Sequence, residues 1–129
     1  MAGDVILIVD DERRLWDLYK HHLAPDGYNL RFAEDGFEAV REARGGDAAL
    51  IIMDLNMPHV DGLLGIEVLR EIQVKAPIFV VSGYLTPEQR SKGIPGATAV
   101  FDKPIDFVAL RAAVRQALGQ SDSKAGAAP

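Results

Sequence analysis

Cysteine is absent from the 129 residues. Its absence excludes a disulfide framework, a zinc–thiolate site and a thiol nucleophile, and it suits the reducing cytoplasm, where we expect the protein to lie. Basic residues are outnumbered as well, with 14 Lys and Arg against 19 Asp and Glu. The resulting net charge of −5 argues against nucleic acid as a direct partner, because phosphate binding needs a basic patch.

Long apolar runs are also missing, since none approaches the ~20 residues that a membrane-spanning helix needs. Gly3 and Asp4 precede the first apolar run, so the start of the chain lacks the pattern of a signal peptide. We therefore expect no contact with a membrane. The length predicts one domain over residues 1–119, and the small polar residues of 120–129 predict a disordered tail.

The sequence does contain a series of short apolar runs, and four of them are followed by an acidic, hydroxyl or lysine side chain. β-branched runs of this length are typical of strands buried on both faces of a parallel sheet. The residues that follow the runs are Asp10 and Asp11 after 5–9, Asp54 after 50–53, Ser82 after 78–81 and Lys103 after 99–102.

Strand patterns alternate with helix patterns along the whole chain. Strands are predicted over 5–9, 28–33, 50–53, 77–81 and 98–102, and helices over 13–24, 36–44, 63–74, a short stretch from 87, and 107–118. Such alternation predicts an α/β fold with a parallel sheet and helices on both faces. The leading candidate is the flavodoxin-like (βα)5 fold with strand order 2-1-3-4-5, whose ligand site lies where the first and third strands are neighbours.

In that order Asp10, Asp11 and Asp54 converge at the carboxyl edge of the sheet. Clustered carboxylates repel one another and need a cation or strong hydrogen bonds. A carboxylate can also attack phosphorus to form an acyl phosphate, and a divalent cation then offsets the added negative charge. We predict Mg²⁺ with Asp11 and Asp54 as direct ligands, Asp10 acting through water, and the backbone carbonyl of Asn56 as a further ligand.

Two more residues complete the predicted site. Lys103 is expected to neutralise one phosphoryl oxygen as a point charge, and Ser82 to donate a hydrogen bond to another. Because phosphoryl transfer passes through a loose transition state, positioning and charge stabilisation do most of the work.

Two other functions share parts of this pattern. A phosphatase of the haloacid-dehalogenase type also uses an aspartate nucleophile, but it needs a second aspartate two residues later, where this chain has Asn56. A flavin-binding module of the flavodoxin kind needs a hydroxyl-rich phosphate loop after the first strand. Here Asp10 and Asp11 stand at that place and would repel the phosphate.

Taken together, the motifs resemble the receiver domain of bacterial two-component response regulators. The residues that carry the resemblance are 8–12 (IVDDE), 53–58 (MDLNMP), Asp61-Gly62, Ser82-Gly83 and Lys103-Pro104. The resemblance implies a signalling domain rather than an enzyme, one that catalyses only its own phosphorylation and dephosphorylation. Asp54 would accept a phosphoryl group from a sensor histidine kinase or a histidine phosphotransfer protein, and a downstream effector protein would read the change.

The same resemblance assigns Asp10 and Asp11 to magnesium, Ser82 to the switch hydroxyl and Lys103 to the lysine whose bond to proline is usually cis in receivers. Two features depart from the family pattern. The position three residues before the lysine is usually aromatic and here is Val100, and the helix from 87 is cut short by Gly93 and Pro95. We therefore predict activation without an aromatic rotamer switch, and a mobile segment over 86–96. A stand-alone receiver and one excised from a larger protein fit the sequence equally well.

Overall fold

The computed structural model describes residues 3–55 and 62–119. Within them, five strands alternate with five α-helices, and a short 3₁₀ turn follows the first helix (Ala24–Asp26). The strands are β1 (Val5–Val9), β2 (Asn29–Ala33), β3 (Ala48–Asp54), β4 (Ile78–Ser82) and β5 (Ala99–Asp102). The helices are α1 (Arg13–Leu23), α2 (Gly36–Ala43), α3 (Gly62–Glu71), α4 (Pro87–Lys92) and α5 (Phe107–Ala117).

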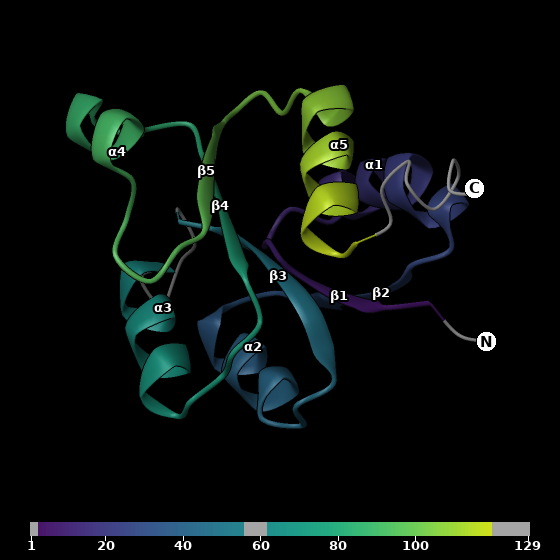
Figure 1. The fold of residues 1–129 in the computed structure, drawn as a ribbon, viewed down its shortest axis with the longest axis horizontal. Coiled ribbons are helices and arrows are strands. Elements are labelled where there is room, and N and C mark those ends of the chain that lie inside the picture. The colour runs from purple at the N-terminus through teal and green to yellow at the C-terminus, as the bar shows by residue number, and fades with distance from the viewer. Residues whose placement is uncertain (1–2, 56–61, 120–129) are drawn as a thin grey trace.

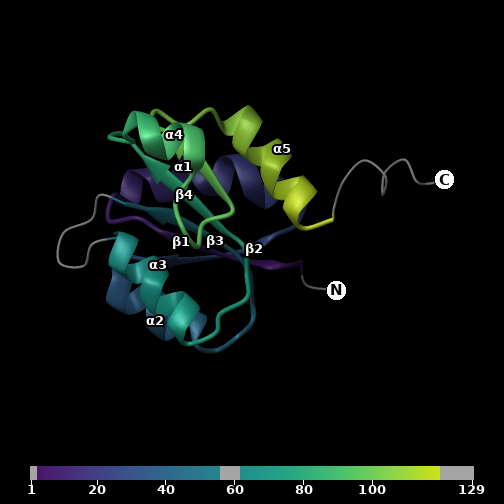
Figure 2. The ribbon, with the colours of Figure 1, turned by 60° about the vertical axis from the view of Figure 1, so that its left-hand side comes forward.

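The strands form one parallel sheet in the order β2-β1-β3-β4-β5, which confirms the predicted flavodoxin-like fold. Figure 1 shows α1 and α5 together on one side of the sheet and α2 and α3 on the other, and the turned view in Figure 2 keeps these pairs apart. After β1 the chain continues to β2, at one edge of the sheet. After β3 it continues to β4, toward the other edge. The carboxyl ends of these two neighbouring strands therefore flank the crevice where this fold binds ligands.

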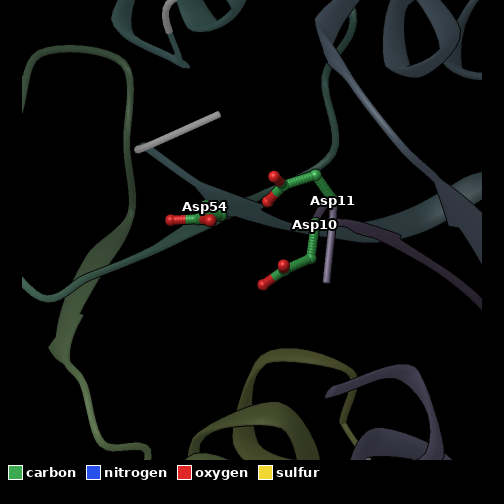
Figure 3. A group of neighbouring side chains, drawn as sticks. All are labelled: Asp10, Asp11 and Asp54. Atoms are coloured by element: carbon green, nitrogen blue, oxygen red, sulfur yellow. The ribbon is translucent and has the colours of Figure 1, made fainter. Parts of the chain in front are cut away.

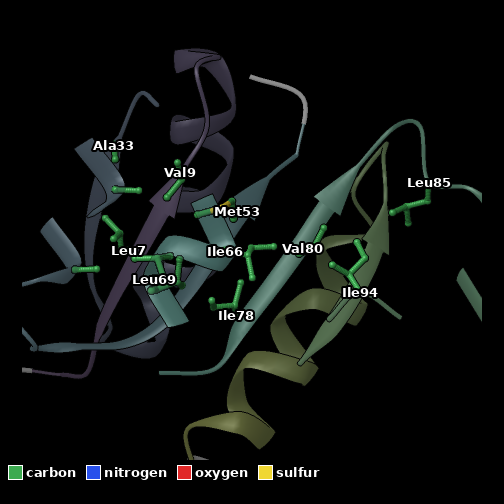
Figure 4. Packing of buried hydrophobic residues seen from close by; sticks show 13 residues of the cluster. Leu7, Val9, Ala33, Met53, Ile66, Leu69, Ile78, Val80, Leu85 and Ile94 are labelled. Atoms are coloured by element: carbon green, nitrogen blue, oxygen red, sulfur yellow. The ribbon is translucent and has the colours of Figure 1, made fainter. Parts of the chain in front are cut away.

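Alternation along the strands divides the core into two layers. On β1, Leu7 and Val9 face α2 and α3, while Ile6 and Ile8 face α1 and α5. Figure 4 shows the first layer, in which Ile66 and Leu69 of α3 pack against the sheet. Because side chains of a strand alternate between faces, a central strand covered on both sides must be apolar throughout, as β1 is.

The predicted helix starts are present as capped N-termini. The Asp35 carboxylate accepts a hydrogen bond from the Glu38 amide at 2.9 Å, and Asp106 accepts from the amides of Val108 and Ala109 at 3.1 Å each. Thr86 and Gln89 form a complete capping box, with both reciprocal hydrogen bonds at 3.0 Å. These side chains satisfy amides that the first helical turn leaves without partners.

The largest departure from the predicted boundaries is at α3, which ends at Glu71 and not near Val74. The third strand is also longer than predicted, Ala48–Asp54 in place of 50–53. The Val74 amide donates to the Leu69 carbonyl and the Gln73 amide to the Arg70 carbonyl, both at 3.0 Å. This pair of bonds is a Schellman motif, and it places Gln73 at the left-handed position with φ of 67°. Glycine is usual at that position, so the sequence carried no stop signal there.

Among the described residues, no helix is both long and apolar enough to cross a bilayer. The predicted tail over 120–129 lies outside the described part of the chain, as do residues 56–61.

Candidate functional site

Three carboxylates meet at the carboxyl edge of the sheet. Asp54 is the last residue of β3, and Asp10 and Asp11 directly follow β1, whose Val9 is paired with Met53. One oxygen from each carboxylate lies within 4.8 Å of the other two, and Figure 3 shows the three side chains next to one another. The predicted convergence is thus confirmed by the geometry.

Burial differs sharply within this group. Asp10 and Asp54 are 1% and 3% exposed, whereas Asp11 is exposed to solvent. Burial raises the pKa of Asp10 to about 6, and the neighbouring carboxylates of Asp54 and Asp11 add to the rise. The Glu12 amide, which donates to Asp10 Oδ1 at 2.8 Å, and the ammonium of Lys103 act in the opposite direction.

Lys103, which follows β5, supplies a positive charge to the cluster. Its Nζ lies 3.3 Å from Asp54 Oδ2 and 3.5 Å from Asp10 Oδ2. Burial disfavours the charged ammonium, but the two carboxylates outweigh this and raise the pKa of Lys103. The amide of Lys103 donates to the Ser82 carbonyl, and the bond to Pro104 is cis, as it usually is in the family that the sequence resembles.

Ser82 ends β4, next to β3, and is buried. Its hydroxyl oxygen accepts a hydrogen bond from the Tyr84 amide at 3.0 Å. On β5, Val100 packs into the layer of α2 and α3, and Phe101 faces the other layer, where it contacts Phe79 with ring centroids 5.4 Å apart. Phe101 therefore packs in the core on the opposite face of β5 and does not supply an aromatic ring at the position of Val100.

The donor set fits a hard divalent cation. Three carboxylates supply the oxygen ligands that Mg²⁺ prefers. Asp10 Oδ2 is buried, and apart from the 3.5 Å ion pair with Lys103 it has no hydrogen-bond partner among the described residues, so a metal-bound water could donate to it. The remaining predicted ligand, the carbonyl of Asn56, lies outside the described residues.

One contact at the site was not predicted from the sequence. Trp16 lies in α1, outside the motifs of the sequence analysis. Its indole Nε1–H donates to the backbone carbonyl of Asp10 at 2.9 Å. A separation of six residues across a strand-to-helix turn has no sequence signature, so only the folded backbone reveals the pair.

Comparison with known proteins gives a consistent result. Residues 6–115 match the family model described as the response regulator receiver domain. The transcriptional regulatory protein PcoR of Escherichia coli is 32% identical over 121 residues, which are 93% of this chain and 54% of PcoR. The chain thus spans about half the length of the curated relatives it matches.

Solved structures agree with this match. The response regulator TrrA of Thermotoga maritima, in complex with Mg²⁺ and BeF, is 31% identical with a TM-score of 0.78, covering 89% of this chain and 99% of that one. The chemotaxis response regulator CheY4 of Vibrio cholerae is 28% identical with a TM-score of 0.79, covering 90% and 99%.

Proposed function

Because the chain belongs to the family of response regulator receiver domains, we propose that Asp54 is its phosphoacceptor. The observation that supports this most directly is the position of Asp54, a buried carboxylate at the end of β3 with Lys103 Nζ 3.3 Å away and Asp10 and Asp11 beside it. The donor would be a phosphohistidine of a sensor kinase or a phosphotransfer protein, and these partners place the reaction in the cytoplasm.

In the proposed step an Asp54 carboxylate oxygen forms a bond to phosphorus while the P–N bond of the donor breaks. The bonding electrons leave with the imidazole, which takes up a proton. The Lys103 ammonium, which pairs with the Asp54 carboxylate in this structure, would pair with a phosphoryl oxygen after the transfer. The Ser82 hydroxyl would donate a hydrogen bond to another phosphoryl oxygen. A bound Mg²⁺, held by Asp11 and Asp54 with Asp10 in the outer shell, would offset the negative charge on the phosphoryl group. The metal in the TrrA complex supports this choice.

Signalling would begin at Ser82. Its hydroxyl accepts the Tyr84 amide in this structure, so turning toward a phosphoryl group would release that amide and the loop before α4. Val100 is half-buried and packed, so no ring is available there to follow the movement. Beryllofluoride with Mg²⁺ should therefore shift the backbone amide resonances of 82–96 most. Larger shifts around Val100 and α5 would contradict this route.

The phosphatase alternative is not supported, because both the family match and the relatives are receivers and response regulators. The expected absence of nucleic acid stays a prediction for this domain. PcoR is a transcriptional regulatory protein, and this chain spans about half of it.

A mass measurement tests the acceptor. The protein is incubated with acetyl phosphate and Mg²⁺, and intact mass spectrometry should show one base-labile phosphoryl group on the wild type and none on Asp54→Asn. Asp17→Asn is the matched control, since Asp17 is exposed on α1 and should leave the adduct unchanged. An adduct of equal yield on Asp54→Asn would move the acceptor to another residue.

A further inference from the structure

The indole of Trp16 is held in place on more than one side. Its ring stacks on Phe32 of β2 with centroids 4.8 Å apart and planes at 24°. The Arg13 guanidinium lies 4.9 Å from the centre of the indole, and Arg13 is itself paired with Glu34 beyond β2. Stacking and cation–π contacts of this kind fix the plane of a ring, and therefore the direction of its N–H.

That N–H donates a hydrogen bond to the backbone carbonyl of Asp10, the residue that directly follows β1. The Asp10 amide donates to the Ala33 carbonyl of β2 at 3.0 Å, and the Asp10 carbonyl accepts from Trp16 at 2.9 Å. Both polar groups of the Asp10 backbone thus have partners from other elements. The carbonyl belongs to the peptide that joins Asp10 to Asp11, so the indole fixes the plane of that peptide.

Asp11 depends on this peptide more than its neighbours do. Asp10 and Asp54 are buried and held near Lys103, whereas the Asp11 side chain is exposed and appears in none of the described hydrogen bonds or ion pairs. The direction of its carboxylate is therefore set mainly by its backbone. If the Asp10–Asp11 peptide turned, a ligand of the proposed metal site would turn with it.

We propose that Trp16 is a positioning residue for the metal site: its indole N–H orients the Asp10–Asp11 peptide and through it the Asp11 carboxylate. The inference rests on the proposed function, because it takes Asp11 as a Mg²⁺ ligand. Groups that hold a metal ligand in its orientation raise the affinity for the metal without contacting the metal themselves.

Two substitutions separate the hydrogen bond from the packing. Trp16→Phe keeps a ring to stack on Phe32 but removes the donor, and Phe32→Leu removes the stacked ring but keeps the donor. Calorimetric titration with MgCl₂ should show affinity about tenfold weaker for Trp16→Phe, at the low end of outer-shell effects. Phe32→Leu should weaken binding less, because the N–H donor and its Arg13 contact remain.

Two further measurements distinguish the proposed role of Trp16 from a purely structural one. In the metal-free protein, the Asp11 and Glu12 amides should exchange hydrogen faster in Trp16→Phe, while amides in β3 and β4 keep their protection. Phosphorylation of Trp16→Phe by acetyl phosphate should be slow at low Mg²⁺ and recover at saturating Mg²⁺. If Trp16→Phe does not fold, 3-benzothienylalanine at this position keeps the ring shape and replaces the N–H with sulfur.

A folded Trp16→Phe protein with unchanged Mg²⁺ affinity would overturn the proposal, and so would equal weakening by Phe32→Leu. Failure of the proposed function looks different. The wild type would then bind Mg²⁺ more tightly than Trp16→Phe, yet neither protein would acquire a phosphoryl group.

Discussion

At the residue scale, Asp10 carries an electrostatic cost, because its carboxylate is buried next to two other acids. Its pKa is raised from 3.8 to about 6, chiefly by burial. The folded protein therefore binds this proton more tightly than the unfolded chain does. Protonation of Asp10 therefore favours the folded state. This contribution to the free energy of unfolding is fully present below about pH 4 and is lost as the pH rises through about 6.

We predict that Asp10→Asn raises the free energy of unfolding of the metal-free protein at pH 7 by roughly 1–3 kcal/mol, and changes it much less at pH 4. Urea denaturation in EDTA at the two pH values measures this difference. Asp11→Asn is the control and should have a smaller effect, because Asp11 is exposed. Lower stability of Asp10→Asn at pH 7 would contradict the assigned cost.

Tyr28 presents a simpler case at the same scale. Its hydroxyl is buried and makes no hydrogen bond among the described residues, while its ring belongs to the core layer of α1 and α5. Tyr28→Phe should leave the free energy of unfolding unchanged or raise it by about 1 kcal/mol, because an unsatisfied buried hydroxyl is costly. Tyr84→Phe makes the same chemical change on a side chain that is 79% exposed, and should be neutral. A loss above about 1 kcal/mol for Tyr28→Phe would reveal a partner for the hydroxyl.

At the scale of elements, the end of α3 shows a local conflict between sequence and backbone. Gln73 adopts φ of 67° and is exposed, so its side chain adds little to offset the strained conformation. Gln73→Gly should raise the free energy of unfolding by about 0.5–1 kcal/mol, as measured by thermal or urea denaturation.

Gly46 offers the reverse experiment. It has φ of 81°, and a Cβ added there would meet nothing within 4 Å. Gly46→Ala should therefore lower stability by a similar amount, through backbone strain alone. Effects of the same sign in the two variants would show that the left-handed conformation is not what decides them.

Helix α4 has few contacts that hold it against the sheet. None of its residues is buried, and Leu85 and Ile94 are buried on either side of it. Its Arg90 forms a two-oxygen ion pair with Asp102 of β5, and this pair is exposed to solvent. Exposed pairs contribute little to stability, so the helix opens at low cost.

Amides of 88–96 should therefore exchange hydrogen faster in the metal-free protein than those of α1, α2, α3 and α5. They should slow when Mg²⁺ and beryllofluoride occupy the site. Mass spectrometry or NMR can follow the exchange, with α5 as the internal reference. Protection of α4 equal to that of α5 before ligand is added would refute the prediction.

At the scale of the whole molecule, metal binding and folding should be linked. A ligand that binds only the folded state at a hundredfold excess over its Kd stabilises by about 2.7 kcal/mol. Mg²⁺ should thus raise the melting temperature at pH 7. The increase should fade as the pH falls below about 6, because protons then compete for Asp10. Asp11→Asn and a NaCl series of equal ionic strength are the controls. An increase that persists in Asp11→Asn would place the metal elsewhere.

Much of this molecule could be predicted without coordinates. The five strands, their order and the convergence of Asp10, Asp11 and Asp54 follow from short apolar runs that end in polar residues. A parallel sheet then brings the carboxyl ends of its strands to one edge. The caps at Asp35, Thr86 and Asp106 were readable because capping is local chemistry between residues two or three positions apart.

Other features depended on the tertiary structure. The unequal burial of Asp10 and Asp11, which are adjacent in sequence, arises because one side chain turns into the protein and the other toward solvent. The Trp16 contact and the Gln73 cap depend on the path of the folded backbone. Neither tryptophan nor glutamine is a residue type from which such a role can be predicted. The sequence by itself determined which residues reach the site, since strand periodicity and topology are enough for that. Their charge states and orientations were decided only in the fold, because desolvation and hydrogen-bond direction depend on neighbours that are distant along the chain.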